Sequence, residues 1–498
     1  MAEKEVVKTE ENELKRGIKS WQVSFIGIGG VIGSCYFLGL GLSIHDMGPA
    51  VFIAFAIVGV IVYGLMIGYS ELLVNVPRTG SFVSYTREFI GPTVSTGFGW
   101  AFWFNWVCYV PSEAIAVSTV ITGLAGTQSA TAYAAIALGT MAAITLINLC
   151  AVDIFAKIEA GLAITKVIMI ILFIIIAFGI WVGLWGSNDT YTGFLAGHVN
   201  FGGEVGFMQN LFPMGFLAVA VNMVVVLVTF QGTEIVGLAA AESQDPDESV
   251  PKACKSVTFR IVALYLLPIL LIIMILPLGL ASDTEPVFAT VMKYYNMGPF
   301  GIIFSAVVLV AAFSCANTGF YGTVRCMFGL SIEGLAPKFL SKVNKQGNPR
   351  SAVLWTLIFM WAVLIIGLIS QLTGALGSLY STLLSLSGFT GSVAWIGISI
   401  SWVVFRKRLK ANGYDPGTCL KAKVKPGQKW IPVFSFIVQI MCLIMLAFQD
   451  LKVFFIAMCA IFLPMICYRI AKASGKLRDE SSLAKGEKTF EELFPPLK

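Results

Sequence analysis

The chain has 498 residues, of which 57% are hydrophobic and only 12% are charged. A soluble protein usually carries about 25% charged residues, so this composition excludes the soluble globular classes and indicates an all-α membrane protein with many spans. The net charge of +6 does not point to nucleic acid, because the basic residues lie between apolar stretches. The first 19 residues lack an apolar run, and no cleavable signal peptide is expected.

A transmembrane helix needs about 20 apolar residues, and twelve stretches of the chain meet that length. The predicted spans are about 20–44, 50–75, 94–123, 131–151, 156–182, 214–241, 257–281, 299–326, 351–371, 377–405, 431–449 and 452–471. This reading divides the chain into a tail at 1–19, a core at 20–405, a basic loop at 406–430, two accessory helices at 431–471 and a tail at 472–498.

The first predicted span carries a run of glycines at its centre. Gly27, Gly29, Gly30 and Gly33 interrupt long apolar residues, and each glycine weakens a helix by roughly 1 kcal/mol relative to alanine. The run predicts a broken helix whose free amides would bind a carboxylate. Close helix packing through small residues is the alternative on the glycines alone. A dinucleotide site is not indicated, because no strand precedes the run.

Basic residues gather in the connections on the side of the N-terminus. They include Arg78, Arg87, Lys252, Lys255, Arg260, Lys338, Lys342, Lys345, Arg350 and the basic run from Arg406 to Lys429. The connections on the opposite side, among them 183–210, are nearly free of Lys and Arg. Because cytoplasmic loops carry the excess of positive charge, we predict that both termini are cytoplasmic.

The sixth predicted span carries a second interruption, Phe230-Gln-Gly-Thr-Glu234. Its polar side chains are costly at mid-membrane, and Gly232 permits an unwound turn. The span opens a second group of five spans, and because five is odd, that group is inverted relative to the first. Two broken helices at matching positions of inverted halves, about 20–182 and 214–405, indicate a substrate site at their interface.

Several strings together resemble a known family. They are Ile28-Gly-Gly-Val-Ile-Gly33, Gly80-Ser-Phe82, Phe230-Gln-Gly-Thr-Glu-Ile-Val-Gly237, Ser249-Val-Pro-Lys-Ala253, Ser314-Cys-Ala-Asn-Thr-Gly319, Glu333-Gly-Leu-Ala-Pro-Lys338 and Ser387-Gly-Phe-Thr-Gly391. The chain resembles amino acid permeases of the amino acid–polyamine–organocation superfamily, in its bacterial amino acid transporter branch. The resemblance covers about 20–405. It implies a leucine-transporter-like fold, with a five-plus-five inverted repeat and two extra helices, and amino acid uptake coupled to protons or another gradient.

The resemblance also implies a substrate site at the two interruptions. Its residues are Val31, Gly33, Ser34 and Cys35, which would meet the substrate carboxylate, and Phe230 and Gly232, whose carbonyls would accept from the amino group. The Phe230 ring would close over the substrate, or else only pack. Where the family usually has glycine and an aliphatic residue, this chain has Cys35 and Tyr36, so a narrower pocket or a changed preference is expected.

Lys166 is the main coupling candidate. A helix starting near residue 156 places it about 15 Å deep, near the centre of a core about 30 Å thick. An ionisable residue there is a functional candidate, and relatives carry a lysine beside the place where sodium-coupled cousins hold a cation between the first and eighth spans. Lys166 is expected to gain and lose a proton. A fixed charge that only holds helices together is the alternative.

Other polar residues of the spans are weaker candidates. Glu234 is expected to carry protons or contact a basic substrate, or else to cap the interruption, and Glu113 is a further coupling candidate. Glu71 and Glu159 are expected to be structural and to pair with basic residues of the cytoplasmic loops. Ser314 and Asn317 are expected to polarise the contact between the first and eighth spans, as functional groups or as interhelical hydrogen bonds.

These features predict a proton symporter that imports an L-α-amino acid across the plasma membrane by alternating access. Its expected partners are the amino acid, the proton and the lipid bilayer, with no cofactor, no metal and no nucleic acid. An enzyme is not expected, because the sequence holds no nucleophile–base or metal-ligand constellation. An amino acid exchanger on the same fold is the first alternative. A receptor that binds an amino acid and signals is the second, against which the short termini argue.

Overall fold

The structure is a computed structural model that describes residues 18–149, 152–185, 207–282, 284–344, 348–373, 379–475 and 487–497. Within these ranges the regular structure is helical, apart from one isolated bridge between Ile18 and Ser243. The all-α prediction is confirmed. Ten helical stretches of the described chain are long and apolar enough to cross a membrane, with Ser34–Asn75 counted as one and the shorter Trp430–Met445 not included. The predicted number of twelve spans is not confirmed.

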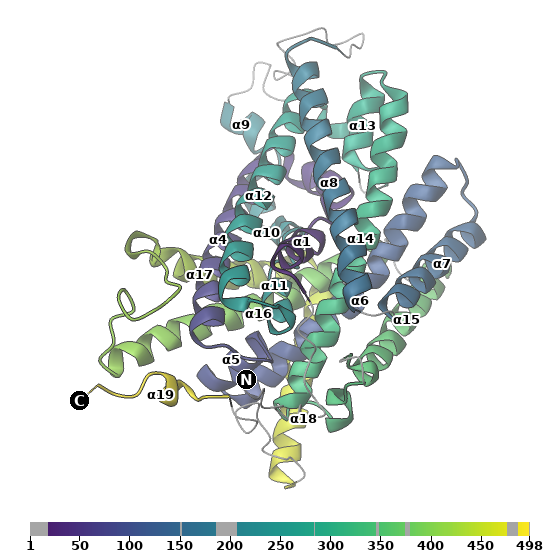
Figure 1. The fold of residues 1–498 in the computed structure, drawn as a ribbon. Coiled ribbons are helices and arrows are strands. Elements are labelled where there is room, and N and C mark those ends of the chain that lie inside the picture. The colour runs from purple at the N-terminus through teal and green to yellow at the C-terminus, as the bar shows by residue number, and fades with distance from the viewer. Residues whose placement is uncertain are drawn as a thin grey trace, which may run out of the picture.

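The helices of the first part of the chain lie between residues 20 and 181 (Figure 1). They are α1 (Ser20–Gly29), α2 (Ser34–Phe37), α3 (Gly39–Met47), η1 (Gly48–Ala50), α4 (Val51–Asn75), α5 (Phe82–Phe89), α6 (Pro92–Leu124), α7 (Ala130–Asn148) and α8 (Val152–Trp181). The first predicted span is therefore three short helices. α1 ends inside the glycine run, and residues 30–33 separate it from α2.

The second part contains longer helices and several short connecting ones. They are α9 (Phe207–Leu211), α10 (Gly215–Val228), α11 (Ile235–Ala239), η3 (Ala240–Glu242), α12 (Pro246–Ile275), η4 (Leu278–Leu280), α13 (Val287–Tyr294), α14 (Gly298–Ile332), η5 (Lys338–Ser341), α15 (Arg350–Leu372), α16 (Leu379–Ala411), η6 (Pro426–Gln428), α17 (Trp430–Gln449), α18 (Leu451–Ala473) and α19 (Phe490–Leu493). The sixth predicted span is broken between α10 and α11.

Some predicted boundaries differ from the observed ones. α12 begins at Pro246, well before the predicted 257, because proline is suited to the first position of a helix and hydropathy does not detect the polar first turns. α16 continues to Ala411, so the basic connection predicted from 406 starts inside a helix. The apolar stretch of α17 is Trp430–Met445, shorter than the other spans. Much of the predicted outer loop, 186–206, lies outside the described residues.

The core is built on α6 and α14, which pack against each other along much of their length. Gly319 of α14 faces Trp106 of α6, and a Cβ on this glycine would lie 2.0 Å from the indole ring. α14 also packs against α8, and α6 also packs against α16. The α6–α14 pair therefore lies at the centre of the helix packing. In Figure 1, α1 lies near the middle of the bundle, with α8 and α12 on either side.

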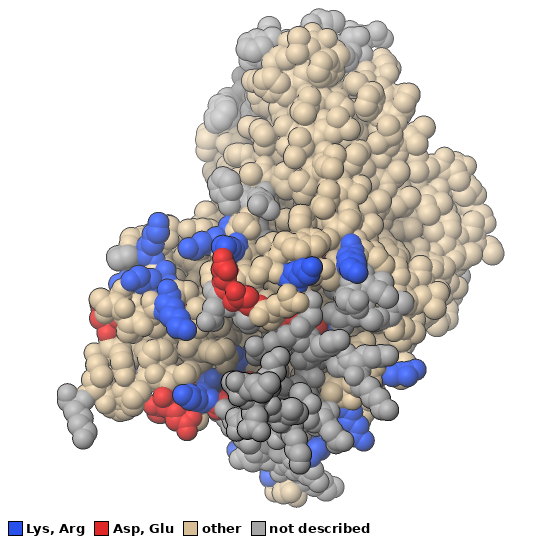
Figure 2. Space-filling model, viewed as in Figure 1, with Lys and Arg blue, Asp and Glu red and all other residues tan. Residues whose placement is uncertain are grey.

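Charged side chains are concentrated toward one end of the molecule. In the view of Figure 2 they gather around the end that carries α5, α18 and α19, while the rest of the visible described surface is uncharged. Large apolar side chains such as Ile168 and Ile366 are 57% and 64% exposed. An apolar surface of this kind suits contact with lipid.

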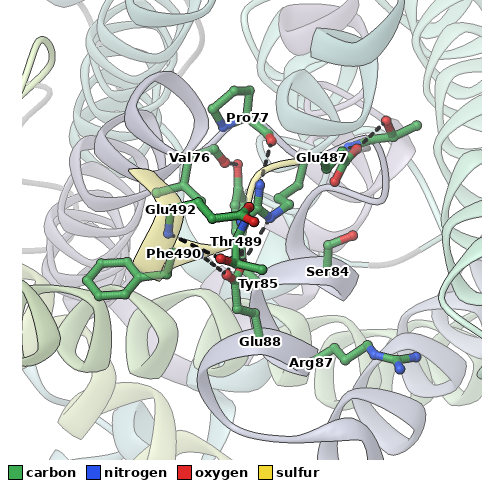
Figure 3. A network of polar contacts seen from close by, with 12 residues as sticks. Val76, Pro77, Ser84, Tyr85, Arg87, Glu88, Glu487, Thr489, Phe490 and Glu492 are labelled. Carbon is green, nitrogen blue, oxygen red and sulfur yellow. Dashed lines mark hydrogen bonds and ion pairs between the residues drawn. The ribbon is translucent and has the colours of Figure 1, made fainter. Parts of the chain in front are cut away.

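The described C-terminal segment, residues 487–497, lies against α5 and the residues just before it (Figure 3). Glu88 of α5 forms an ion pair with Arg78 at 2.8 Å and accepts a hydrogen bond from the Phe490 amide at 2.9 Å. The Phe490 ring packs edge-on against Phe89 of α5 and Phe405 of α16, with both centroid distances 5.9 Å. The segment thereby ties α5 to the end of α16.

Candidate substrate and coupling site

The break between α1 and α2 exposes four successive backbone carbonyls, and side chains bind all of them. Lys166 Nζ donates to the carbonyls of residues 29 and 32 at 2.7 and 2.9 Å. Cys315 Sγ donates to the carbonyl of residue 30 at 3.0 Å, and Tyr265 Oη to that of residue 31 at 3.1 Å. Because unpaired backbone groups cost several kcal/mol in a membrane, these side chains make the broken conformation stable.

The first amide of α2 binds a carboxylate of the protein itself. Ser34 N donates to both Glu113 carboxylate oxygens, each at 3.1 Å, and Ser34 Oγ lies 3.1 Å from Tyr380 Oη. A Cβ on Gly33 would lie 2.4 Å from Glu113 Oε1, so only glycine leaves room for this approach. Glu113 therefore occupies the place where the sequence predicts the substrate carboxylate.

The break between α10 and α11 lies directly against the first one. Gly232 has φ +102°, a conformation that glycine tolerates, and a Cβ on it would lie 2.4 Å from the Gly30 carbonyl oxygen. Glu234 turns back on its own segment and accepts from Gly232 N at 3.0 Å and from Trp395 Nε1 at 2.9 Å. In this structure Glu234 thus makes a capping contact.

Tyr265 of α12 links the two breaks, and the sequence reasoning missed it. Its single O–H is shared between two acceptors, the Val31 carbonyl at 3.1 Å and the Thr229 carbonyl at 2.7 Å. Its ring stands edge-on to Phe230, with centroids 4.7 Å apart. The available signal was a tyrosine inside an apolar span, since a buried hydroxyl needs a hydrogen-bond partner.

The six predicted substrate residues all lie at the two breaks, and their side chains or backbones are buried. Phe230 packs between Tyr265 and Phe55, whose centroid is 5.8 Å away. Cys35 Sγ accepts from Tyr109 Oη at 2.9 Å. Tyr36 stacks on Tyr265 at a centroid distance of 4.1 Å, so an aromatic cluster encloses the site on the α12 side.

Lys166 joins three parts of the fold. Besides the two carbonyls of the first break, its Nζ donates to Ser314 Oγ of α14 at 2.8 Å. An ammonium has three N–H donors and no acceptor, so these contacts use its full donor capacity. The side chain is fully buried. The structure therefore places this positive charge where α1, α8 and α14 meet.

Glu159 does not pair with a loop residue, which corrects the sequence prediction. It is fully buried and accepts hydrogen bonds from Ser314 Oγ and, at 3.4 Å, from Asn317 Nδ2. A Cβ on Gly29 would lie 1.8 Å from Glu159 Oε1, so the carboxylate sits directly against the end of α1. The prediction failed because a charge one to two turns inside a helix looks accessible when the neighbouring helices are unknown.

Glu71 behaves as a structural residue. It forms an ion pair with Arg406 at 2.6 Å and accepts from Trp402 Nε1 at 3.0 Å. Arg406 belongs to α16 rather than to a loop, so this pair fixes α4 against α16.

The described residues contain no group of three or more His, Cys, Asp or Glu side chains arranged to hold a metal ion. The three carboxylates near the two breaks, Glu113, Glu159 and Glu234, are each bound instead by backbone amides or neutral side chains.

Comparison with known proteins agrees with this architecture. The Amino acid permease family model matches residues 22–480. The chain is 34% identical to the lysine-specific permease LysP of Lactococcus lactis, over 82% of this chain and 79% of the relative. It is 30% identical to the amino-acid permease RocE of Bacillus subtilis, over 95% and 97% of the two chains, and 34% identical to a putative histidine permease of that bacterium, over 81% and 82%. The chain belongs to the amino acid permease family.

Proposed function

We propose that this protein imports an L-α-amino acid across the plasma membrane by proton symport with alternating access, and that both of its termini are cytoplasmic. The observation that carries the proposal is the contact between two broken helices, at Gly30 and Gly232, with the buried amine of Lys166 bound to the first break. Paired helix breaks at the centre of a transporter are typical of substrate and ion sites.

In the proposed complex the substrate carboxylate binds the Ser34 amide and hydroxyl. In the present structure the Ser34 amide donates to the carboxylate of Glu113, which supports the proposal that a carboxylate can bind there. The substrate amino group binds the carbonyls of Phe230 and Gly232. Each carbonyl already accepts one hydrogen bond and keeps a second lone pair for the substrate. The Phe230 ring covers the bound molecule.

Lys166 supplies the proposed coupling. As an ammonium it donates to two carbonyls of the first break and to Ser314. A neutral amine no longer carries the positive charge, and hydrogen bonds from a charged donor are roughly twice as strong as those from a neutral one. Loss of the proton therefore weakens the contacts with the two carbonyls and loosens α1 from α8 and α14. Release of the proton toward the cytoplasm therefore favours opening on that side.

The driving force is adequate for accumulation. One charge crossing a membrane of about 150 mV releases roughly 3.5 kcal/mol. At about 1.4 kcal/mol for each tenfold ratio, this supports a roughly 300-fold gradient of substrate.

Uptake into liposomes tests the function. The purified protein is reconstituted, and labelled amino acids are offered with and without an imposed inward proton gradient, in the absence of sodium. The panel begins with lysine and histidine, because the relatives named above include a lysine-specific and a putative histidine permease, and continues with neutral amino acids. Accumulation that follows the proton gradient supports symport. Movement of label only into liposomes preloaded with amino acid would identify an exchanger, and a sodium requirement would contradict proton coupling.

A further inference from the structure

We propose that Glu159 is the acceptor of the proton that Lys166 releases, and that Ser314 relays it. The inference rests on the proposed proton symport and adds a coupling residue to it. It concerns a buried carboxylate that contacts the first helix break and that the substrate site does not use.

The hydrogen bonds between these residues have one direction. Lys166 Nζ donates to Ser314 Oγ at 2.8 Å, and Ser314 Oγ donates to Glu159 Oε1. An ammonium can only donate and an ionised carboxylate can only accept, so the single hydroxyl proton of Ser314 points to Glu159. The three groups form a continuous path along which a proton can pass from nitrogen to carboxylate.

The transfer along this path is balanced. One N–H bond of Lys166 breaks as an O–H bond forms on Ser314, while the original O–H proton of Ser314 passes to Glu159 Oε1. The products are a neutral amine, an unchanged serine and a neutral carboxylic acid. No electron is transferred and no further reactant is needed.

A proton acceptor close to Lys166 avoids leaving an uncompensated charge inside the protein. Lys166, Ser314 and Glu159 are all fully buried. Loss of the lysine proton to distant water would leave the carboxylate as an uncompensated buried charge, which is strongly unfavourable. Transfer to Glu159 neutralises both groups together, and the summed charge of the pair is zero before and after.

Among the described residues, the Glu159 carboxylate lies near the ammonium group of Lys166 and beside a series of polar side chains. The elements packed around it contribute Gly29 of α1, and Ser314, Asn317 and Thr318 of α14, and Lys166 of its own helix. The further titratable groups that act on Lys166 are Glu113, Cys35 and Cys315. Asn148 Nδ2 of α7 donates to Asn317 Oδ1 at 2.6 Å, so polar groups continue from the carboxylate toward the end of α7.

The position of Glu159 along α8 gives the path its direction. Glu159 and Lys166 are seven residues apart in one helix, which is two turns, so they share a face and are separated by about 10 Å of rise. Glu159 is the nearer of the two to the start of α8, which is the cytoplasmic end in the proposed orientation. The proton therefore moves inward when it passes from Lys166 to Glu159.

The test compares Glu159→Gln with Glu159→Asp in the full-length reconstituted protein. Glu159→Gln keeps the size of the side chain but cannot accept a proton. We expect accumulation driven by a proton gradient to fall from roughly 300-fold toward unity, with its dependence on pH flattened, while counterflow of labelled substrate falls far less. Glu159→Asp should recover part of the accumulation and of the pH dependence.

A second pair of variants tests the relay without touching the carboxylate. Ser314→Ala removes the bridging hydroxyl and should lower accumulation, whereas Ser314→Thr keeps a hydroxyl and should retain more of it. Ser305→Ala, at another buried serine of α14, is the matched control and should transport like the wild type.

Three results would overturn the proposal. An inserted Glu159→Gln protein with wild-type accumulation and pH profile shows that the carboxylate accepts no proton. Equal losses of counterflow and accumulation assign it a structural role. Should Glu159→Gln fail to insert, equal accumulation by Ser314→Ala and Ser314→Thr rejects the relay. Failure of the wild type to respond to a proton gradient is a separate result and rejects the proposed symport itself.

Discussion

The carbonyl oxygen of Gly30 lies 2.4 Å from the point where a side chain on Gly232 would place its Cβ. Residues about 200 positions apart in the sequence thus bring two helix breaks into backbone contact. The backbone groups of both breaks then lie close together. Lys166 of α8, Tyr265 of α12 and Cys315 of α14 stabilise them by binding their carbonyls.

Gly232→Ala should disrupt this contact. The substitution adds an atom where the space is filled and forces alanine into a positive φ, which costs about 1–2 kcal/mol on its own. We expect a lower melting temperature of the purified protein and loss of substrate binding. Gly139→Ala is the control, because that glycine of α7 has nothing within 4 Å of its Cβ position. Unchanged binding by Gly232→Ala would show that the two breaks need not touch.

Phe230→Ala should weaken transport by removing the ring that is proposed to cover the substrate. The ring now packs edge-on against Tyr265, and loss of a buried phenylalanine costs roughly 3–5 kcal/mol of packing. We expect a higher apparent KM in the uptake assay, with Phe230→Tyr and Phe230→Trp affected less. Wild-type kinetics in an inserted alanine variant would return Phe230 to a packing role.

Glu113→Gln should strengthen substrate binding. The carboxylate of Glu113 now holds the Ser34 amide, so a substrate carboxylate has to displace it. A charge-assisted hydrogen bond is roughly twice as strong as a neutral one, so the uncharged glutamine should compete less with the substrate for the Ser34 amide. If the competition weakens by about 1.4 kcal/mol, the Kd of the substrate becomes tenfold tighter. Equilibrium binding of labelled substrate measures this change. Weaker binding would instead indicate that Glu113 contacts the substrate directly.

The positions of the two helix breaks and the burial of Lys166 could be predicted, because each depends on residues within one short stretch of sequence. Glycines and charged groups inside apolar runs are conspicuous in any one stretch of sequence, and the inverted grouping of spans suggests which stretches meet. The same reasoning missed Tyr265, because a tyrosine in an apolar span is common and only its two carbonyl partners distinguish it.

The environment of Glu159 could not be predicted for a different reason. Its partners are Ser314 and Asn317, more than 150 residues away along the chain. Which face of α8 meets α14 depends on the packing of the whole bundle, not on the sequence near Glu159. The first turns of α12 and the short helix α5 were missed because they are not apolar enough to register as membrane segments.

Phe490→Ala should detach the C-terminal segment from α5 and α16. The variant removes the ring contacts with Phe89 and Phe405 but leaves the ion pair of Glu88 with Arg78. We expect faster proteolysis near the C-terminus and a lower melting temperature. Leu497→Ala, at a side chain that is 59% exposed, serves as the control. Equal protease sensitivity of the two variants would contradict a docked segment.

Lys166→Met should abolish proton-driven accumulation and also destabilise the protein. Methionine keeps much of the length of lysine but donates no hydrogen bond, so the carbonyls of Gly29 and Ile32 lose their partner and Glu159 loses its counter-charge. Removing one member of a buried charged pair costs roughly 3–5 kcal/mol, whereas replacing both is often neutral. The double variant Lys166→Met with Glu159→Gln should therefore recover much of the melting temperature without recovering accumulation. Melting curves and liposome uptake of the two single variants, the double variant and the wild type complete the cycle. Accumulation by an inserted Lys166→Met protein in response to a proton gradient would make Lys166 a structural charge, and Glu234 would then be the next coupling residue to test.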